Sequence, residues 1–231
     1  MGRIAENIAS VNERIRAAAL RAGRDPGAVR LVAVTKHRSM EDTRAVLDTG
    51  ERLLGENRVD EAVEKFAAFR DADYEPPIEW HFIGHVQSRK AKQLVGETAL
   101  IHSLDSIKLA EKFQRVCDEA DCTVRVLMEV NVSGEASKYG FTPESAMEAA
   151  KALKPLDRVE CVGLMTMAPY LDDPEDTRPV FGNLRLLRDR LRDAGHDHLH
   201  LEHLSMGMTN DFEIAVEEGA TLVRVGTALF S

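Results

Sequence analysis

The chain has 231 residues, of which 44% are hydrophobic and 30% charged. These are ordinary globular proportions, so the composition excludes a disordered chain, a collagen-like repeat and a disulfide scaffold. The formal net charge is −9 and there is no run of Lys or Arg, which argues against nucleic acid as a main partner. No apolar run approaches the roughly 18 residues of a membrane span, which argues against a membrane partner.

The first twenty residues predict an amphipathic surface helix. Ile4, Ile8, Val11 and Ile15 recur at helical spacing, and the charged residues between them exclude a secretory signal peptide. The cysteines are odd in number and form no C-x-x-C pair, which favours reduced, structural thiols. We therefore expect a cytoplasmic protein.

Beyond this helix, short apolar runs alternate with helical patterns. The predicted strands cover residues 31–35, 52–55, 80–83, 99–103, 124–132, 160–165, 199–205 and 221–226. The predicted helices cover residues 41–48, 59–69, 107–119, 144–153, 180–192 and 212–218, with a weaker short helix at 87–94. Ser39, Asp105 and Thr142 are the expected N-caps of three helices.

This alternation predicts an α/β fold. Runs that are apolar on both faces and are followed by helices indicate parallel strands. Eight such units predict one (β/α)₈ TIM barrel over residues 1–231, with the N-terminal helix as an addition. An open doubly wound sheet is the alternative, but its first strand is usually followed by a glycine-rich turn, whereas Thr35-Lys36-His37 stands here.

Lys36 follows the first predicted strand. Alternation places Val32, Val34 and Lys36 on one face, which we expect to be the barrel interior. Functional residues of such barrels stand at the C-terminal ends of strands. A lysine with a desolvated stem would have a lowered amine pKa and could attack an aldehyde. A solvated lysine just past a strand end is the alternative interpretation.

The last two predicted strands end in residues typical of an anion site. Ser205-Met206-Gly207 follows the seventh strand and Gly226-Thr227 follows the eighth. The loops at these two places are the recurrent phosphate site of the fold. Hydroxyl groups and backbone N–H groups are what an anion requires. Each glycine alone could be a turn residue, but together these segments indicate a phosphate cradle.

Arg224 precedes Gly226 by two residues and should face the same side. A buried arginine needs a partner, which could be a carboxylate such as Glu202 or Glu129, or a ligand atom. An aldehyde-reactive lysine, a phosphate cradle and a buried arginine together suggest pyridoxal 5'-phosphate (PLP), with its ring nitrogen facing Arg224.

With these residues in place, the sequence resembles the YggS/PROSC family of PLP homeostasis proteins, single-domain barrels related to the N-terminal domain of alanine racemase. Seven segments carry the resemblance, and they occur in the family's order. They are LVAVTK (31–36), GEN (55–57), WHFIGHVQSRK (80–90), VNVSGEASKYGF (130–141), GLMTM (163–167), LSMGMTNDFEIAVEEG (204–219) and VRVGTALF (223–230).

The resemblance implies that Lys36 holds PLP as a Schiff base and that Arg224 approaches the pyridine nitrogen. It implies phosphate contacts from Ser205, Met206, Gly207, Gly226 and Thr227, and a pocket lined by Asn57, His81 and Met165. The chain departs from the family pattern at 37–38, 58–60 and 89, which we expect to affect the rim of the pocket or partners.

Two groups of residues are weighed as decoys. His196, His198, His200 and His203 cluster in sequence, but they precede or begin the seventh strand, at the end of a barrel that serves stability rather than function. We therefore expect no metal site there. Lys138 follows the fifth strand and is either a second aldehyde-reactive lysine or a solvated loop residue.

Three functions compete. The first is a PLP carrier in intracellular PLP homeostasis, a monomer or weak dimer whose partners are PLP and apo PLP-dependent enzymes, with no catalytic residue. The second is a racemase-like PLP enzyme, which needs an acid or base on each face of the substrate. Lys36 could serve one face, but Tyr74, Tyr139 and Tyr170 have no evident claim to the other. The third is a Schiff-base aldolase acting on a phosphosugar.

Overall fold

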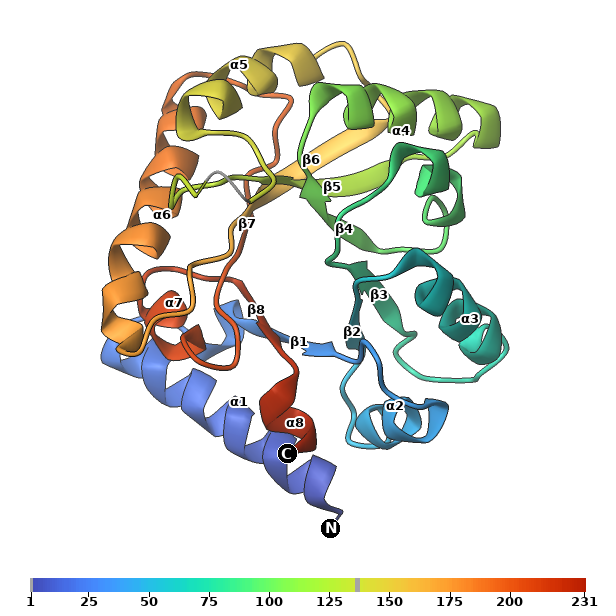
Figure 1. Ribbon diagram of the computed structural model, residues 1–231, viewed down its shortest axis with the longest axis vertical. Coiled ribbons are helices and arrows are strands. Elements are labelled where there is room, and N and C mark those ends of the chain that lie inside the picture. The colour runs from blue at the N-terminus through green and yellow to red at the C-terminus, as the bar shows by residue number, and fades with distance from the viewer. Residues whose placement is uncertain (1, 136–137) are drawn as a thin grey trace.

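The computed structural model describes residues 2–135 and 138–231. Eight parallel strands close into a barrel in chain order, and β1 pairs with both β2 and β8. Helices surround the strands (Figure 1). The predicted (β/α)₈ barrel is therefore confirmed, and the open sheet is excluded because both of its edges would have to be unpaired.

Each strand is followed by a helix on the outside of the barrel. The strands are β1 (Arg30–Val34), β2 (Leu53–Glu56), β3 (Glu79–Phe82), β4 (Leu100–Leu104), β5 (Val124–Glu129), β6 (Val159–Met165), β7 (His203–Ser205) and β8 (Leu222–Val225). The α-helices are α1 (Arg3–Arg21), α2 (Met40–Leu47), α3 (Val59–Phe69), α4 (Ile107–Ala120), α5 (Pro143–Leu153), α6 (Arg178–Asp193), α7 (Phe212–Glu217) and α8 (Thr227–Phe230). After β3 the helix is the 3₁₀ segment η2 (Ser88–Gln93), where the sequence predicted only a weak short helix. Two further 3₁₀ segments are η1 (Pro26–Ala28) and η3 (Pro174–Thr177).

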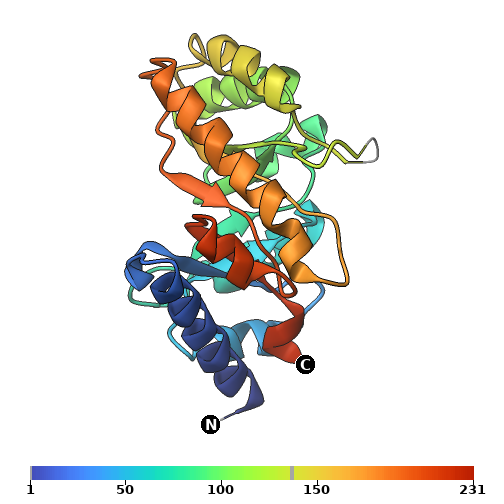
Figure 2. The ribbon, with the colours of Figure 1, turned by 90° about the vertical axis from the view of Figure 1, so that its left-hand side faces the viewer.

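The N-terminal helix α1 is confirmed and covers the end of the chain. Its buried face carries Ile8, Val11 and Ile15, the positions with helical spacing. α1 packs against α7 and α8, and Figure 2 shows the two chain ends on the same side of the molecule. The Asn7 side-chain amide donates to the backbone carbonyls of Leu229 (3.2 Å) and Ser231 (3.0 Å). The first helix thus holds the segment that follows β8.

Three predicted strands are shorter in the structure, β8 by one residue at each end and β5 and β7 by more. β5 ends at Glu129 rather than at residue 132, because the Glu129 carbonyl accepts from Phe141 N and the chain turns into a loop closed by that contact. β7 begins at His203 rather than at residue 199. Glu202 N bonds both to Val162 O and to His200 O, and this local turn interrupts the ladder. Both larger errors lie where a local turn replaces the pairing that the apolar pattern predicts.

Two of the three predicted caps are confirmed and one is wrong. Ser39 and Thr142 accept from the backbone of α2 and α5, as expected. Asp105 does not cap α4, since the next residue, Ser106, accepts from Leu109 N instead. The Asp105 carboxylate is engaged with His85 at 2.8 Å. This contact between His85 and Asp105 lies at the C-terminal ends of β3 and β4, the end of a TIM barrel that carries functional residues.

Apolar side chains fill the interior of the barrel, which is open at the C-terminal ends of the strands. Seven interior side chains form a separate cluster: Val32, Leu53, Leu100, Leu127, Val162, Met165 and Leu222. Residues one position along each strand pack outward against the helices and form the larger core. Because side chains alternate along a strand, residues two positions past this cluster stand above it, at the C-terminal ends of the strands.

Among the residues that the structure describes, no helix is long and apolar enough to cross a bilayer.

Candidate functional site

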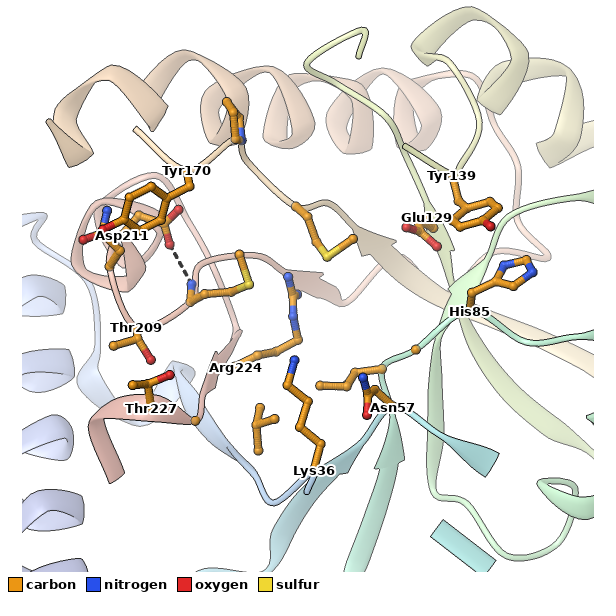
Figure 3. Close-up of a pocket in the computed structure, with 18 residues that line it drawn as sticks. Lys36, Asn57, His85, Glu129, Tyr139, Tyr170, Thr209, Asp211, Arg224 and Thr227 are labelled. Atoms are coloured by element: carbon orange, nitrogen blue, oxygen red, sulfur yellow. Dashed lines mark hydrogen bonds between the residues drawn. The ribbon is translucent and has the colours of Figure 1, made fainter. Parts of the chain in front are cut away.

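A cavity of about 510 Å³ opens above the interior cluster, at the C-terminal ends of the strands. Figure 3 shows Lys36 and Arg224 extending into its middle. Thr209, Thr227, Asp211 and Tyr170 stand on one side, and Glu129, Tyr139 and His85 on the other. This is the end of a TIM barrel at which ligands bind.

The structure brings five of the ten predicted site residues to the cavity wall, namely Lys36, Asn57, Arg224, Gly226 and Thr227. The other five lie beneath or behind it. Met165 belongs to the interior cluster, and Met206 is fully buried in the outer core. His81, Ser205 and Gly207 support residues of the wall rather than facing the cavity.

Lys36 reaches the cavity from a turn just beyond β1. Its side chain is exposed, so the expected desolvated stem is absent. The physical reason is that β1 ends at Val34 and that His37 turns the chain with a positive φ of 58°. Lys36 therefore stands at the mouth of the cavity, with Val34 lining the floor below it.

A buried ion pair holds the start of that turn. Lys65 of α3 donates to Glu56 Oε1 at 2.7 Å and to the Thr35 carbonyl at 2.6 Å. The Thr35 hydroxyl donates to the same Glu56 oxygen at 2.6 Å. Glu56 and Thr35 are fully buried and Lys65 is 3% exposed. Both the backbone and the side chain of the residue before Lys36 are thereby fixed.

Arg224 is the main charge in the cavity floor. It is 5% exposed, and its guanidinium donates to the Ser205 hydroxyl and to the Thr166 carbonyl. Neither carboxylate that the sequence offered as a partner pairs with it: Glu202 is exposed elsewhere, and Glu129 faces the same cavity without an ion pair. Burial lowers the pKa of Arg224 to about 10, which leaves it charged at neutral pH.

Behind Arg224 runs a chain of buried polar groups. The Ser205 hydroxyl contacts His102 Nδ1 at 2.8 Å, and His102 Nε2 contacts His81 Nδ1 at 2.9 Å. Burial lowers the pKa of His81 to about 3 and that of His102 well below its usual value, so both rings are neutral. One neutral ring nitrogen donates and the other accepts. Donors and acceptors therefore alternate in the same order through both rings, and the two histidines orient the Ser205 hydroxyl that holds Arg224.

Two glycines allow the loops after β7 and β8 to close. A Cβ at Gly207, where φ is +91°, would lie 2.5 Å from Ala215 Cβ and 2.9 Å from Phe212 Cα, so only glycine fits against α7. A Cβ at Gly226 would lie 3.3 Å from Val34 Cβ, on the cavity floor. The backbone after β8 therefore passes close to β1 at the cavity wall.

The opposite wall carries a carboxyl group. Glu129 is 5% exposed, and burial raises its pKa to about 7, with a further contribution from Asp105 against the opposing attraction of Arg224. Next to it, His85 stacks on Tyr139 with ring centroids 4.1 Å apart. The cavity thus has a cationic floor and an acidic side.

Sequence reasoning missed several residues of the wall. Tyr139 and Tyr170 line it, although neither tyrosine was assigned a role, and they are 58% and 83% exposed. Thr209 and Asp211 come from the loop before α7, inside the segment that carried the family resemblance. Asp211 Oδ1 accepts from Met208 N at 2.6 Å and so shapes this loop. His85 could have been suspected, because it lies just beyond the C-terminal end of β3, which ends at Phe82.

The decoys do not line this cavity. Lys138 Nζ bonds to Glu135 at 2.8 Å and to the Met167 carbonyl at 3.2 Å, and the lysine does not line the cavity. In the sequence cluster of histidines, His198 Nε2 contacts the Ala150 carbonyl at 2.7 Å. Within residues 2–135 and 138–231, no group of three His, Cys, Asp or Glu side chains could hold a metal.

The donor set fits an anionic aldehyde with an aromatic ring. Arg224 is a buried cation with hydrogen-bond donors to spare, and Lys36 supplies a primary amine to the same cavity. Gly226, Thr227 and Thr209 offer close backbone approach and two hydroxyl groups. Asn57 adds a buried side-chain oxygen, Oδ1, that has no partner among the described residues. These are the requirements of a phosphorylated pyridine aldehyde such as PLP.

Comparison with known proteins extends this result. The sequence model of the alanine racemase N-terminal domain matches residues 3–231. A pyridoxal phosphate homeostasis protein of Aquifex aeolicus is 45% identical over 225 residues, which are 97% of this chain and 96% of that protein.

Solved structures agree over almost the whole chain. An unknown protein of Bifidobacterium adolescentis superposes with a TM-score of 0.93 at 40% identity, covering 99% of this chain and 94% of that one. PipY of Synechococcus elongatus, whose structure has PLP bound, superposes with a TM-score of 0.84 at 34% identity and covers 99% of this chain and 100% of its own.

Proposed function

This chain belongs to the pyridoxal phosphate homeostasis protein family, and from that membership we propose that it binds PLP reversibly and acts in PLP homeostasis by buffering or delivering the cofactor. The observation that carries the proposal is Arg224, a buried cation with no carboxylate partner, in one cavity with the Lys36 amine. A buried guanidinium with unused N–H donors is costly unless an acceptor atom satisfies them, and a ring nitrogen of a ligand can do so.

Lys36 is the attachment site in this proposal. Its amine would hold PLP as a Schiff base with the aldehyde that the cofactor supplies. Attachment would release one water and hydrolysis would take it up again, so holding and releasing PLP would need no oxidant or reductant. Lys36 is exposed at the cavity mouth, which gives water and other amines access to it.

The remaining residues would bind and orient. Arg224 would meet the ring nitrogen, held in place by Ser205 and His102. Thr227 and the backbone at Gly226 would bind the phosphate, and we keep Ser205, Met206 and Gly207 in that group through the loop they form. Asn57 would contact the ring from the side of β2. His81 and Met165 would act from beneath, as supports.

We propose a carrier role rather than turnover, with apo PLP-dependent enzymes as recipients in the cytoplasm. One observation supports a racemase-like activity as second candidate: Tyr139 and Tyr170 both line the cavity. A tyrosine could serve the substrate face opposite Lys36. Loss of α-deuterium from amino acids by the PLP-loaded protein, abolished by Tyr139→Phe or Tyr170→Phe, would favour that candidate. Reactivation of an apo enzyme without such exchange would favour the carrier.

The attachment site is tested by reduction. Borohydride treatment of the PLP-loaded protein should leave one adduct, and peptide mapping should place it on Lys36. In Lys36→Ala the adduct should be lost, while Lys138→Ala, which changes a lysine outside the cavity, should keep it. An adduct that persists in Lys36→Ala would contradict the proposal.

A further inference from the structure

Glu129 lines the cavity but has no role in the proposed binding of PLP. Glu129 lies on the wall opposite Thr227 and Thr209, on the side of His85 and Tyr139 (Figure 3). Only 5% of its surface is exposed. Within the described part of the chain its carboxylate accepts no hydrogen bond and forms no ion pair, although Asp105 beside it is paired with His85.

The direction of this side chain is set by the backbone. Leu127, two residues earlier in β5, belongs to the interior cluster, so Glu129 faces inward as well. The Glu129 carbonyl accepts from Phe141 N at 2.8 Å, and a Cβ at Gly140 would lie 2.7 Å from that same oxygen. These contacts fix the backbone at the end of the strand, so the Glu129 side chain starts from a position that faces the cavity.

A buried carboxylate with free acceptor positions calls for a donor that carries positive charge. Arg224 attracts Glu129 electrostatically but forms no ion pair with it, because its guanidinium is directed toward Ser205 and Thr166. The Lys36 amine would be bonded to PLP and so would not pair with Glu129. Room remains for a small cation, since Glu129, Lys36 and the exposed Tyr139 share one open cavity.

We propose that Glu129 binds the primary ammonium group of a second molecule that enters the cavity beside Lys36. This rests on the proposed function only in assigning Lys36 to PLP. Two sources share this chemistry: a free amino acid, or the lysine side chain of a protein. In both cases the carboxylate holds the ammonium and is placed to take its proton, which prepares a neutral amine next to the Lys36 site.

The proposal has a pH signature. The groups that face Glu129 are Asp105, His85, Arg224, Lys36 and Asp211, which come from the ends of β4, β3, β8 and β1 and from the turn before α7. Burial raises the pKa of Glu129 to about 7, so its carboxylate fraction increases from about pH 6 to about pH 8. Ammonium binding should strengthen over this range.

The experiment measures binding to the protein without PLP. The probes are methylammonium, L-alanine and the amide of Nα-acetyl-lysine, titrated by NMR against wild type, Glu129→Gln and Glu202→Gln. Glu202 is an exposed glutamate outside the cavity, so its variant is the matched control. We expect Glu129→Gln to weaken binding at least about tenfold, the scale of a charged hydrogen bond, and to remove its pH dependence.

The Glu129 carboxyl resonance of wild type provides a measurement that needs no variant, because a bound ammonium should lower the pKa read from its titration. Tighter binding of L-alanine or of the lysine amide identifies the source. Equal binding to wild type and Glu129→Gln, or an unmoved Glu129 titration, would overturn the proposal. A failure of the proposed function shows separately, as absence of a PLP adduct on Lys36 in wild type.

Discussion

Buried charged residues lie on both sides of the barrel wall, and of those that the structure describes only the ones outside the wall form a direct ion pair. Outside the wall, between β2 and α3, Glu56 and Lys65 pair at 2.7 Å and also hold Thr35. Inside the cavity, Arg224 and Glu129 are 5% exposed each and attract one another, but in the part of the chain that the structure describes neither forms a direct ion pair.

This difference indicates which buried charges stabilise the fold and which bind a ligand. Removing one partner of a buried ion pair is strongly destabilising, because the other charge is left uncompensated. A buried charged group whose hydrogen bonds are incomplete costs stability in the free protein, and a ligand group that completes them recovers that cost. We infer that the Glu56–Lys65 pair serves the fold and positions Lys36, whereas Arg224 and Glu129 serve binding.

The largest effect should come from breaking the outer pair. Lys65→Met leaves Glu56 as a buried carboxylate without a cation, and we expect a loss of about 3–5 kcal/mol in the free energy of unfolding. Lys108→Met, at an exposed lysine of α4, should change it by less than about 0.5 kcal/mol. Urea denaturation measures both. Recovery of part of the loss by Glu56→Leu in the Lys65→Met background would confirm the cause, and a loss as small as the control would refute it.

An intermediate effect should follow from the ionisation of Glu129. Its pKa is raised from the usual 4.5 to about 7, so the folded state binds the proton more tightly and stability falls as pH rises through this window. The fall is roughly 2–3 kcal/mol for Glu129 alone. His81 acts in the opposite sense: its lowered pKa, about 3, makes stability rise with pH from about 3 to about 6.5.

The difference between wild type and Glu129→Gln isolates the carboxyl from the histidine. Thermal or urea unfolding of both proteins from pH 4 to pH 8 should show Glu129→Gln gaining stability relative to wild type as pH rises. Parallel curves would show that Glu129 has an ordinary pKa.

The smallest effect on stability is expected at Arg224. Arg224→Met removes a buried charge that has no carboxylate partner but also its hydrogen bonds to Ser205 and Thr166, so the unfolding free energy of the protein without PLP should fall by about 1–2 kcal/mol. PLP affinity, measured by absorbance titration, should fall about tenfold or more. A stability loss as large as that of Lys65→Met would place Arg224 with the structural pair and remove the contrast.

The parts of this arrangement that depend on local order could be predicted from the sequence. Alternation along a strand, together with the rule that barrel sites lie at strand ends, placed Lys36 and Arg224 at the same end of one barrel. Both residues line the cavity. The glycines at 207 and 226 were expected at the loops where close backbone approach occurs, although the approach at Gly207 is to α7.

The parts that depend on tertiary contacts could not. Lys65 lies on the buried face of α3, and its burial depends on Glu56, which a helical pattern does not show. His102 contacts Ser205 across the barrel, a pairing of residues far apart in sequence. Tyr139 and Tyr170 reach the cavity from loops, whose paths are not encoded by periodicity. The strand ends at Glu129 and His203 were misplaced for a similar reason, since local turns stop both ladders.

Barrel closure has a consequence for synthesis. β1 pairs with β8, and Asn7 of α1 bonds to the carbonyls of Leu229 and Ser231, so the earliest and latest segments complete each other. On the ribosome, Lys36 emerges long before Arg224 and Gly226. Contacts of such high sequence separation form late and slowly. If Lys36 is the attachment site that we propose, a nascent chain exposes its amine without the binding pocket, and specific capture of PLP becomes possible only with the final strand.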